Sequence, residues 1–437
     1  MAITREQILD YHLGGKIGLA LTKRLTDRDT LSMAYTPGVA EAVKAIHAEP
    51  ASINRYTAKA NTVAVVTDGT AILGLGDLGA EASIPVMEGK AVLFKAFADV
   101  DAWPVPLSNC RAGGKNTGPT DVDLLVERTA SLAAMYGGIN LEDLAAPACF
   151  EVEDRLEAML PIPVFHDDQW GTAVITLAGV MNYCLLAERE MAELRIVING
   201  AGAAGIRIAD MLKAAGAASL VLCDSKGVVR ADRTDLNEQK RRHAVDCSLT
   251  TIAEAMKDAH IFVGVSVAGC IQPHEVLAMA SFPAIFAMAN PVPEILPSVV
   301  AEAMGGKPYV MATGRSDFPN QINNVLGFPF LFRGALDAAA STINTEMKVA
   351  ASRALAELAR EAVPQYVKDG YPGEELAFGP DYVVPKPFDR RLFVNVPFAV
   401  AEAAAASGAG KIDDLAAYRT KLEQREARRR KPSECGS

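Results

Sequence analysis

Cysteine is scarce in this chain, and its spacing excludes two kinds of cross-link. The 437 residues include seven cysteines, an odd number, with no CxxC pair and no His-rich spacing. A disulfide framework or a structural zinc site needs closely spaced ligands. We therefore expect reduced thiols in a cytoplasmic protein, at Cys110, Cys149, Cys184, Cys223, Cys247, Cys270 and Cys435.

Positive charge is also in deficit. Lysine and arginine number 43 against 53 acidic residues, which gives a net charge of -10 and a pI near 5.3. Such a chain repels polyanions at long range, so the balance excludes a general binder of nucleic acid or of anionic membranes. A small acidic substrate would need a local positive centre.

Long hydrophobic runs are missing as well. The N-terminal stretch is interrupted by charged residues such as Asp10 and Lys16, unlike the apolar core of a secretion signal. The longest apolar stretch, 173–187, contains Thr176 and Asn182 and is shorter than the roughly 20 residues that a membrane span requires. We expect neither secretion nor a membrane partner, and a buried helix at this stretch.

The length allows two or three domains, and half of the residues are hydrophobic, which predicts folded cores. Residues 1–162 mix strand-like and helical patterns and are expected to form an N-terminal α/β domain. Within it, 62–69 and 91–100 have the composition of strands, while 122–137 has helical spacing. A proline-containing polar loop follows, so we place the domain boundary near Pro163.

The second part, residues 163–437, alternates strands with helices. This alternation predicts a doubly wound, parallel, Rossmann-type sheet. Beyond Pro329 the sequence becomes alanine-rich and helical, which adds a C-terminal helical extension. The basic run at 425–431 is typical of a solvated helix end, where cations are favourable. The expected strands lie at 195–198, 219–224, 261–266 and 284–290.

The pattern GxGxxG occurs twice, and context distinguishes the two copies. The second copy follows an apolar strand, opens a helix, and precedes another strand that ends at Asp224, nineteen positions after Gly205. A dinucleotide site needs these parts, because the turn and the helix N-terminus bind the pyrophosphate and the acidic residue binds the adenosine ribose. The expected cofactor loop is Gly200, Ala201, Gly202, Ala203, Ala204 and Gly205.

The first copy, at Gly74, Gly76 and Gly79, lacks this frame. Pro85 and Gly89 interrupt the residues that follow it, so we expect no clean amphipathic helix there. We predict a loop near a site rather than a second dinucleotide fold.

Two adjacent pairs of carboxylates stand ahead of the cofactor loop. Glu142 and Asp143 form one pair, and Asp167 and Asp168 form the other. Mg²⁺ and Mn²⁺ prefer oxygen ligands in an octahedral array, so three of these side chains could hold such a cation. Spacing alone equally allows two solvated acidic turns.

Eight motifs occur in an order that identifies a family. They are SMAYTPGVAEAV, TDGTAILGLGDLG, PVMEGKAVLFKAFADVD, GGINLEDLAAPACFEVEDRL, PVFHDDQWGTA, INGAGAAG, AMANPVPEI and ATGRSDFPNQINNVLGFPF. From about Leu13 to Gly410 the chain resembles the malic enzyme family in its compact bacterial form, without a phosphate acetyltransferase-like domain. The resemblance implies oxidative decarboxylation of L-malate to pyruvate and CO₂, reduction of NAD or NADP, and a need for Mg²⁺ or Mn²⁺.

The resemblance also implies roles for individual residues. Lys90 matches the general base, Asp167 its carboxylate partner, and Tyr35 the general acid. Burial and a nearby divalent cation would both lower the pKa of Lys90 from its usual value of about 10.4. The matched metal ligands are Glu142, Asp143 and Asp168, and the matched contacts to substrate or nicotinamide are Asn290 and Asn324.

Two details of recognition stay open. Many family members have a substrate-binding arginine where this chain has Ala71, so substrate carboxylate recognition has no assigned side chain. Asp224 favours NAD because it would repel a 2′-phosphate, whereas Ser225 and Lys226 could bind one, and we lean slightly to NADP.

Two alternatives to malate oxidation also remain. A malolactic or oxaloacetate-decarboxylating lyase could use the same site, and a relative that binds nucleotide without turnover is the other. The resemblance further implies a homodimer.

Overall fold

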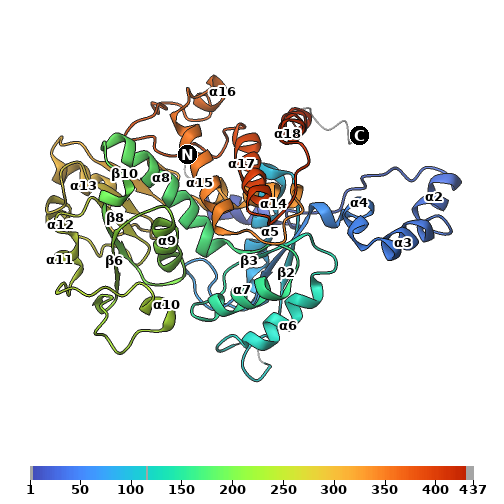
Figure 1. Cartoon of the computed structure of the whole chain (residues 1–437), viewed down its shortest axis with the longest axis horizontal. Coiled ribbons are helices and arrows are strands. Elements are labelled where there is room, and N and C mark those ends of the chain that lie inside the picture. Colours follow the sequence, from blue (N-terminus) through green and yellow to red (C-terminus); the bar gives the residue numbers. More distant parts are fainter. Residues whose placement is uncertain (1–2, 115–116, 430–437) are drawn as a thin grey trace.

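The computed structural model describes residues 3–114 and 117–429 and contains two largely parallel β-sheets (Figure 1). The first sheet has the strand order β2-β1-β3-β4, with every pair parallel. All six residues of β1 are buried, as expected for a parallel strand covered on both faces. This part comprises β1 (Thr62–Thr67), β2 (Asp101–Pro106), β3 (Gly138–Leu141), β4 (Val164–His166), α5 (Ala80–Ala98), α6 (Val122–Leu132) and α7 (Ala148–Met159).

One element of this part differs from the sequence prediction. The strand predicted at 91–100 is wrong, because α5 continues to Ala98. Met87, Ala91 and Phe94 are buried at spacings of four and three residues, so they form one face of a helix. Packing of that face outweighs the β-propensity of the run.

The prediction of no clean helix after the first glycine copy is wrong as well. Gly79 is the N-cap of α5, which continues through Pro85 and Gly89. Pro85 has no N–H for the helix ladder, but its carbonyl accepts a tertiary hydrogen bond of 2.6 Å from Lys16 Nζ. The residues between β1 and Gly79 form a loop, as predicted.

The second sheet confirms the doubly wound α/β prediction. Its order is β10-β9-β8-β5-β6-β7, and of its strand pairs only β6–β7 is antiparallel. Ile196 and Ile198 of β5 join one buried cluster and Val197 joins another, so both faces are covered. Its elements include β5 (Arg195–Asn199), β6 (Ser219–Asp224), β7 (Gly227–Val228), β8 (Ile261–Gly264), β9 (Ala284–Ala287), β10 (Val310–Thr313), α8 (Thr172–Leu186) and α9 (Ala203–Ala214).

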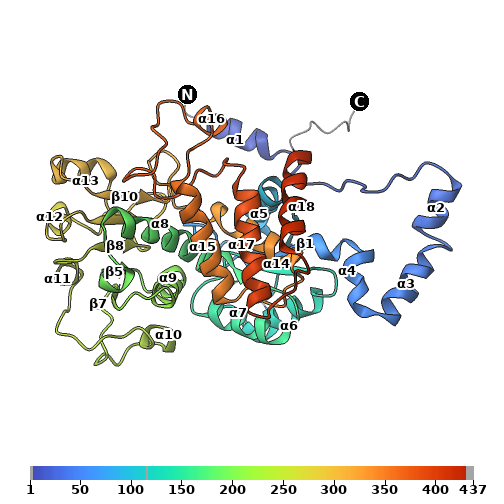
Figure 2. The ribbon, with the colours of Figure 1, turned by 45° about the horizontal axis from the view of Figure 1, so that its top comes forward.

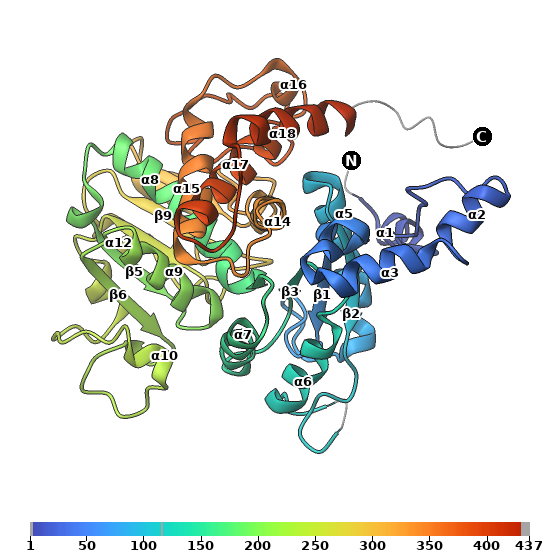
Figure 3. The same ribbon diagram turned by 45° about the vertical axis from the view of Figure 1, so that its right-hand side comes forward.

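The C-terminal helices lie across both sheets rather than on the second sheet alone (Figure 3). The Phe94 ring of α5 lies 4.8 Å from Phe328 and 5.3 Å from Phe332 of α14, between ring centres. Helix α15 packs on α8, and α17 packs on both α14 and α15. These helices are α14 (Phe328–Asp337), α15 (Thr345–Arg360), α16 (Gln365–Lys368), α17 (Leu392–Ala406) and α18 (Leu415–Arg429).

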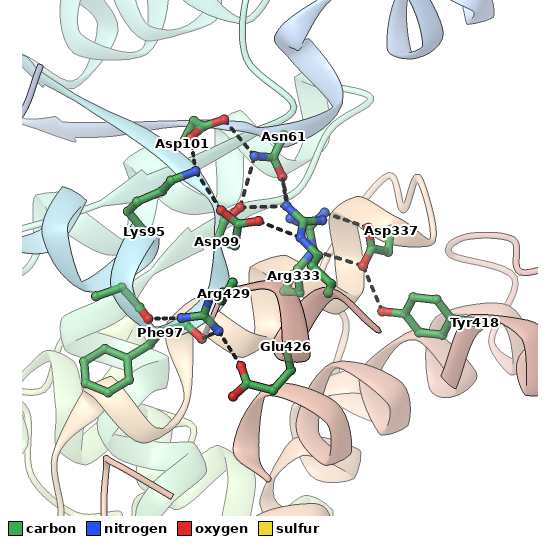
Figure 4. A network of polar contacts seen from close by, with 12 residues as sticks. Asn61, Lys95, Phe97, Asp99, Asp101, Arg333, Asp337, Tyr418, Glu426 and Arg429 are labelled. Carbon is green, nitrogen blue, oxygen red and sulfur yellow. Dashed lines mark hydrogen bonds and ion pairs between the residues drawn. The ribbon is translucent and has the colours of Figure 1, made fainter. Parts of the chain in front are cut away.

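The basic C-terminal run is only partly solvated. Arg425 Nε donates to Asp99 Oδ2 over 2.7 Å, and Arg429 donates to the carbonyls of Phe97 and Ala96 near the end of α5 (Figure 4). The last carbonyls of a helix lack helical partners, so these cations act as a cap. The prediction of a solvated helix end is therefore wrong for Arg425 and Arg429. Arg430, Lys431 and Cys435 lie outside the described residues.

The N-terminal helices include an arm, α2 and α3, that extends away from the rest of the chain (Figures 1 and 2). Neither helix contains a buried residue. Across residues 3–114 and 117–429, no helix is both long and apolar enough to cross a membrane. The remaining helices are α1 (Arg5–His12), α2 (Arg28–Ala34), α3 (Val39–Ala48), α4 (Ile53–Tyr56), α10 (Glu238–Arg241), α11 (Ile252–Met256), α12 (Pro273–Leu277) and α13 (Pro297–Met304).

The ion pair between Arg333 and Asp337 gives a test of how α14 is held. The Arg333 side chain is 2% exposed, and its Nε and Nη2 donate to Asp337 over 2.9 and 2.7 Å (Figure 4). Arg333→Met leaves the carboxylate buried without its cation, and we expect a loss of about 3–5 kcal/mol in the free energy of unfolding. Urea denaturation measures this. Lys411→Met removes only an exposed pair with Asp413 and should barely move the midpoint; equal midpoints for the two variants would contradict the account.

Candidate active site

Two strands of the first sheet end in carboxylates at the same edge. The last residues of β3 and β4 are paired, and Glu142 and Asp167 follow them directly. Because the strands are parallel, their carboxyl ends meet at one edge of the sheet. Oxygens of Glu142, Asp143 and Asp168 all lie within 4.8 Å of one another. The fold therefore brings together the three side chains that the sequence predicts as metal ligands.

Local backbone geometry aims these carboxylates at one another. Asp143 adopts a left-handed conformation with φ 53°, and Asp167–Gly171 form a π-helical turn, η3. The Asp143 N–H donates to Asp168 Oδ2 over 2.8 Å, and the Leu73 N–H donates to Asp143 Oδ1 over 3.1 Å. Asp143 Oδ2 is buried and lacks a hydrogen-bond partner among the described residues. An unpartnered oxygen among clustered carboxylates fits a hard divalent cation.

Burial and mutual repulsion both disfavour the charged carboxylates. Burial, together with the charge of Asp168, raises the pKa of Asp143 to about 7. Burial also raises the pKa of Glu142 well above its usual range, although Lys90 opposes the shift. A bound divalent cation would reverse both effects, because it is the largest local charge in such a site.

Lys90 reaches the same cluster from α5. Its Nζ lies 2.5 Å from Asp167 Oδ2, 2.9 Å from Glu142 Oε1 and 4.7 Å from the centre of the Phe328 ring. Burial alone lowers the pKa of Lys90, but the charges of Asp167 and Glu142 outweigh burial and raise the pKa above its usual value. The lowering that the sequence predicts includes a bound divalent cation and stays a prediction; the protein's own carboxylates act in the opposite direction, because the fold brings two of them within hydrogen-bonding distance of Nζ.

The two predicted asparagines occupy different places. Asn324 Nδ2 donates to Asp167 Oδ2 over 3.2 Å, and its Oδ1 accepts a hydrogen bond of 2.9 Å from Thr172 Oγ1. Asn324 therefore orients the carboxylate that holds Lys90. Asn290 is exposed in the loop after β9, and its Nδ2 lies 3.4 Å from the Met288 carbonyl oxygen.

The second glycine copy forms a cradle at the end of β5, where the strand order of the sheet reverses. Gly200 has φ 123°, and a Cβ there would lie 2.5 Å from the Val265 carbonyl oxygen. A Cβ on Gly205 would lie 1.7 Å from the Gly200 carbonyl oxygen. Gly202 faces open space and is the N-cap of α9. The turn thus leaves room for a pyrophosphate at a helix N-terminus.

Comparison with known proteins agrees with this geometry. The model named "Malic enzyme, N-terminal domain" matches residues 14–157, and "Malic enzyme, NAD binding domain" matches 170–372. The NADP-dependent malic enzyme of Halomonas elongata is 47% identical, over 93% of this chain and 95% of that protein. This chain belongs to the malic enzyme family.

Other members of the malic enzyme family match at different lengths. The NADP-dependent malic enzyme of Rhizobium meliloti is 48% identical over 97% of this chain, but the chain covers only 55% of that relative. The crystal structure of the malic enzyme from Pyrococcus horikoshii superposes with a TM-score of 0.84 at 35% identity, over 98% of this chain and 99% of that one.

Sequence reasoning missed the group that supports η3 in this chain. Arg207 of α9 donates from Nε to Gln169 over 2.9 Å and from Nη2 to Glu153 over 3.1 Å. Trp170 also contacts two cations. The guanidinium carbon of Arg207 lies 4.5 Å from the centre of a Trp170 ring, and Lys348 Nζ lies 3.5 Å from a ring centre of the same residue. These contacts tie the cofactor helix α9 to the turn that carries Asp167 and Asp168. No local pattern signals them, because Arg207 and Glu153 are far apart in sequence.

Ala71 has only its backbone groups at the position where many family members have a substrate-binding arginine. The Ala71 N–H donates to the Asp143 carbonyl over 3.0 Å, so the loop anchors the carboxylate segment. Arg111 contacts the same loop, but it is 1% exposed and is paired with Asp68 over 2.6 Å and with Asp77 over 2.9 Å. Arg111 therefore holds the loop and does not stand in for the family arginine.

Tyr35 is not brought to Lys90 within one chain. It is the C-cap of α2 in the projecting arm and is 70% exposed. Figures 1 and 2 place α2 well away from α5. The family match identifies the residue, but the fold of a single chain does not complete the site with it.

Asp224, which the sequence predicts to bind the adenosine ribose, already has protein partners. Its side chain is 7% exposed and pairs with Arg233 and Lys240. Its partners come from the segment after β7, where no sequence motif marks them.

The carboxylate cluster predicts a measurable metal site. Asp168→Asn removes one of three charged ligands, and we expect Mn²⁺ affinity to fall by at least about tenfold. Isothermal titration of the purified protein with Mn²⁺, without substrate, reports this directly. Asp123→Asn is the matched control, because Asp123 is exposed and pairs only with Arg155 in the described structure. Unchanged Mn²⁺ affinity in Asp168→Asn would rule out this ligand.

Proposed function

We propose that this protein catalyses the oxidative decarboxylation of L-malate to pyruvate and CO₂ with reduction of NAD or NADP. The observation that carries the proposal is the placement of Lys90 Nζ against Asp167 and Glu142, at the edge of a three-carboxylate cluster. A proton acceptor, a metal site and a dinucleotide cradle on the neighbouring sheet are the parts that the reaction needs.

Glu142, Asp143 and Asp168 would hold Mg²⁺ or Mn²⁺. When bound, the cation would polarise the substrate oxygen and stabilise the negative charge left as CO₂ departs. The buried Asp143 Oδ2, which lacks a partner among the described residues, supports this placement.

Side chains of the protein then accept and donate the protons of the reaction. Lys90 takes the proton of the C2 hydroxyl as C2 loses its hydride, and Asp167 keeps Nζ in place. Glu142 lies between Lys90 and the proposed metal site, so a cation bound there would offset part of the negative charge that favours the ammonium form of Lys90. Asn324 fixes Asp167, and Tyr35 is the proposed donor of a proton to C3.

A product assay tests this reaction. L-malate and Mn²⁺ are added with NAD or NADP in separate reactions, and reduced nicotinamide, pyruvate and lactate are measured. We expect pyruvate in equal amount to reduced cofactor. Lactate, or pyruvate without reduced cofactor, would establish a lyase instead, and no product with either cofactor would contradict the proposal.

Lys90 gives the sharpest test of the proton acceptor. Lys90→Met should lower kcat by about 10³-fold, the scale of general acid–base catalysis, while cofactor binding stays intact. Stopped assays with excess enzyme measure the residual rate. Lys95→Met, on the exposed side of the same helix, is the control and should keep its activity. Near-normal turnover by Lys90→Met would remove Lys90 from the mechanism.

We also propose that the arm of α2 and α3 docks on a second copy of this chain and carries Tyr35 to the partner's site. The arm exposes apolar side chains: Leu31 is 52%, Met33 68% and Val43 62% exposed. Such a set is uncommon on a monomer surface and is typical of an interface. The 70% exposed Tyr35 lies at the end of α2, where a partner could cover it.

Mixing two inactive variants tests this arrangement. Tyr35→Phe and Lys90→Met proteins are unfolded together, refolded at equal concentration and assayed. Shared sites in a dimer should restore about 25% of wild-type activity, since half of the dimers are mixed and each mixed dimer has one complete site. The same mixture should show dimer mass by light scattering. No activity above that of the separate variants would place Tyr35 in its own chain's site.

A further inference from the structure

A substrate carboxylate needs a positive partner that Ala71 cannot supply. Arg111 contacts the same loop but is paired with Asp68 and Asp77. The chain as a whole has a net charge of -10, so its overall field does not attract a dianion. A carboxylate that leaves water needs a cation or several N–H donors close by. Arg315, in the loop after β10, is a cation in a position to serve.

The loop that carries Arg315 begins and ends at the site. The Ile322 N–H donates to the Thr313 carbonyl over 2.8 Å, and the Thr313 N–H donates to the Asn320 carbonyl over 3.4 Å. These bonds close the loop at its base, directly after β10. Asn324, which orients Asp167, follows two residues after Ile322. One segment of chain therefore presents Arg315 on its loop and Asn324 behind it.

Arg315 lies against the segment of Asn290. Its Nη1 donates to the Pro291 carbonyl oxygen over 3.1 Å. A Cβ on the preceding Gly314 would lie 2.8 Å from Asn290 Nδ2. The family resemblance matches Asn290 to a contact with substrate or nicotinamide, so Arg315 is placed beside that contact.

The segment of Asn290 in turn meets the loop that holds the carboxylate cluster. A Cβ on Gly74 would lie 3.7 Å from the Asn290 carbonyl oxygen. The N–H of the neighbouring Leu73 donates to Asp143 Oδ1 over 3.1 Å. A short series of contacts thus leads from Arg315 to a proposed metal ligand, and Arg315 lies at the edge of the site.

Arg315 already binds a carboxylate, in a pair that is easily exchanged. Its Nε and Nη2 donate to the two oxygens of Asp317 over 2.8 and 2.7 Å, the bidentate geometry in which arginine recognises carboxylates. The two side chains are 38% and 55% exposed. An exposed pair contributes little stability, because water solvates both charges well. A substrate carboxylate can therefore replace Asp317 and accept the same two hydrogen bonds.

We infer that Arg315 binds the carboxylate of L-malate that pyruvate retains, and that Asp317 holds the guanidinium before substrate arrives. The reaction itself decides between the two carboxylates. A cation on the departing carboxylate would stabilise the charged substrate more than neutral CO₂ and would slow its loss. The retained carboxylate keeps its charge throughout, so a cation there has no such effect. The inference rests on the proposed function, because it names a substrate contact of the same site.

Steady-state kinetics of three variants test the contact. Arg315→Met should raise KM for L-malate about tenfold or more, because charge-assisted hydrogen bonds are lost, while kcat stays within about threefold and KM for the cofactor is unchanged. Arg315→Lys should recover part of this loss, since an ammonium supplies charge without the bidentate geometry. Asp317→Asn should lower KM for L-malate, because it frees the guanidinium. Damage to the loop would instead raise KM in both Arg315→Met and Asp317→Asn.

Arg155→Met is the matched control. Arg155 is also 38% exposed and pairs with Asp123 and Glu151 on the helices α6 and α7. Its replacement removes the same charge from a comparable exposed pair, so KM for L-malate should stay at the wild-type value.

Two fragments of the substrate identify the carboxylate. L-lactate keeps the hydroxyl and the retained carboxylate, whereas 3-hydroxypropanoate keeps the hydroxyl and the departing carboxylate. Their inhibition constants against L-malate are measured with Mn²⁺ and cofactor for the wild type and for Arg315→Met. We expect the variant to bind L-lactate about tenfold more weakly and 3-hydroxypropanoate within about twofold of the wild type.

The outcomes separate this inference from the proposed function. An unchanged KM for L-malate in Arg315→Met, or an equal loss for the two fragments, would overturn the inference while wild-type turnover leaves the proposed function standing. A larger loss for 3-hydroxypropanoate would place Arg315 on the departing carboxylate and would overturn the inference as well. No oxidation of L-malate by the wild type would contradict the proposed function, and this inference with it.

Discussion

The rest of the site depends on one largely buried lysine, Lys90, which is paired with carboxylates. Lys90 Nζ lies within hydrogen-bonding distance of Asp167 and Glu142, and Glu142 in turn belongs to the cluster with Asp143 and Asp168. The negative charges outnumber the single ammonium, and burial makes the charges of Glu142, Asp143 and Asp167 costly. A divalent cation held by this cluster would share its carboxylates with Lys90, and the charge state of the lysine would then depend on that cation.

The fold holds this arrangement from three sides. The parallel pairing of β3 and β4 brings the two carboxylate segments to one edge. Helix α5 presents Lys90, and α14 and the cap from α18 fix the position of α5. Arg207 of α9 contacts Gln169 and Trp170 in the turn that carries Asp167 and Asp168, so the carboxylate cluster and the glycine loop before α9 are joined by direct contacts.

The sequence predicted the parts of this account that depend on local pattern. The glycine loop, the strands β1, β5, β6, β8 and β9, and the paired carboxylates all carry short-range signals. Lys90 carries none, because a single lysine in an apolar run is typical of a solvent-facing side chain, and only the family resemblance singled it out. The strand predicted at 91–100 is the second half of helix α5, because tertiary burial rather than propensity decides that segment. The Arg425 contact joins residues 326 positions apart, which no local pattern can indicate.

The most direct measurement of the central claim is the Mn²⁺ affinity of Lys90→Met compared with that of the wild type, by calorimetry in the absence of substrate. If Lys90 and the cation share the same carboxylates, removing the ammonium relieves a repulsion at close range, and the variant should bind Mn²⁺ several-fold more tightly. Equal or weaker binding in the variant would show that the lysine and the metal do not compete for one cluster, and would contradict the account.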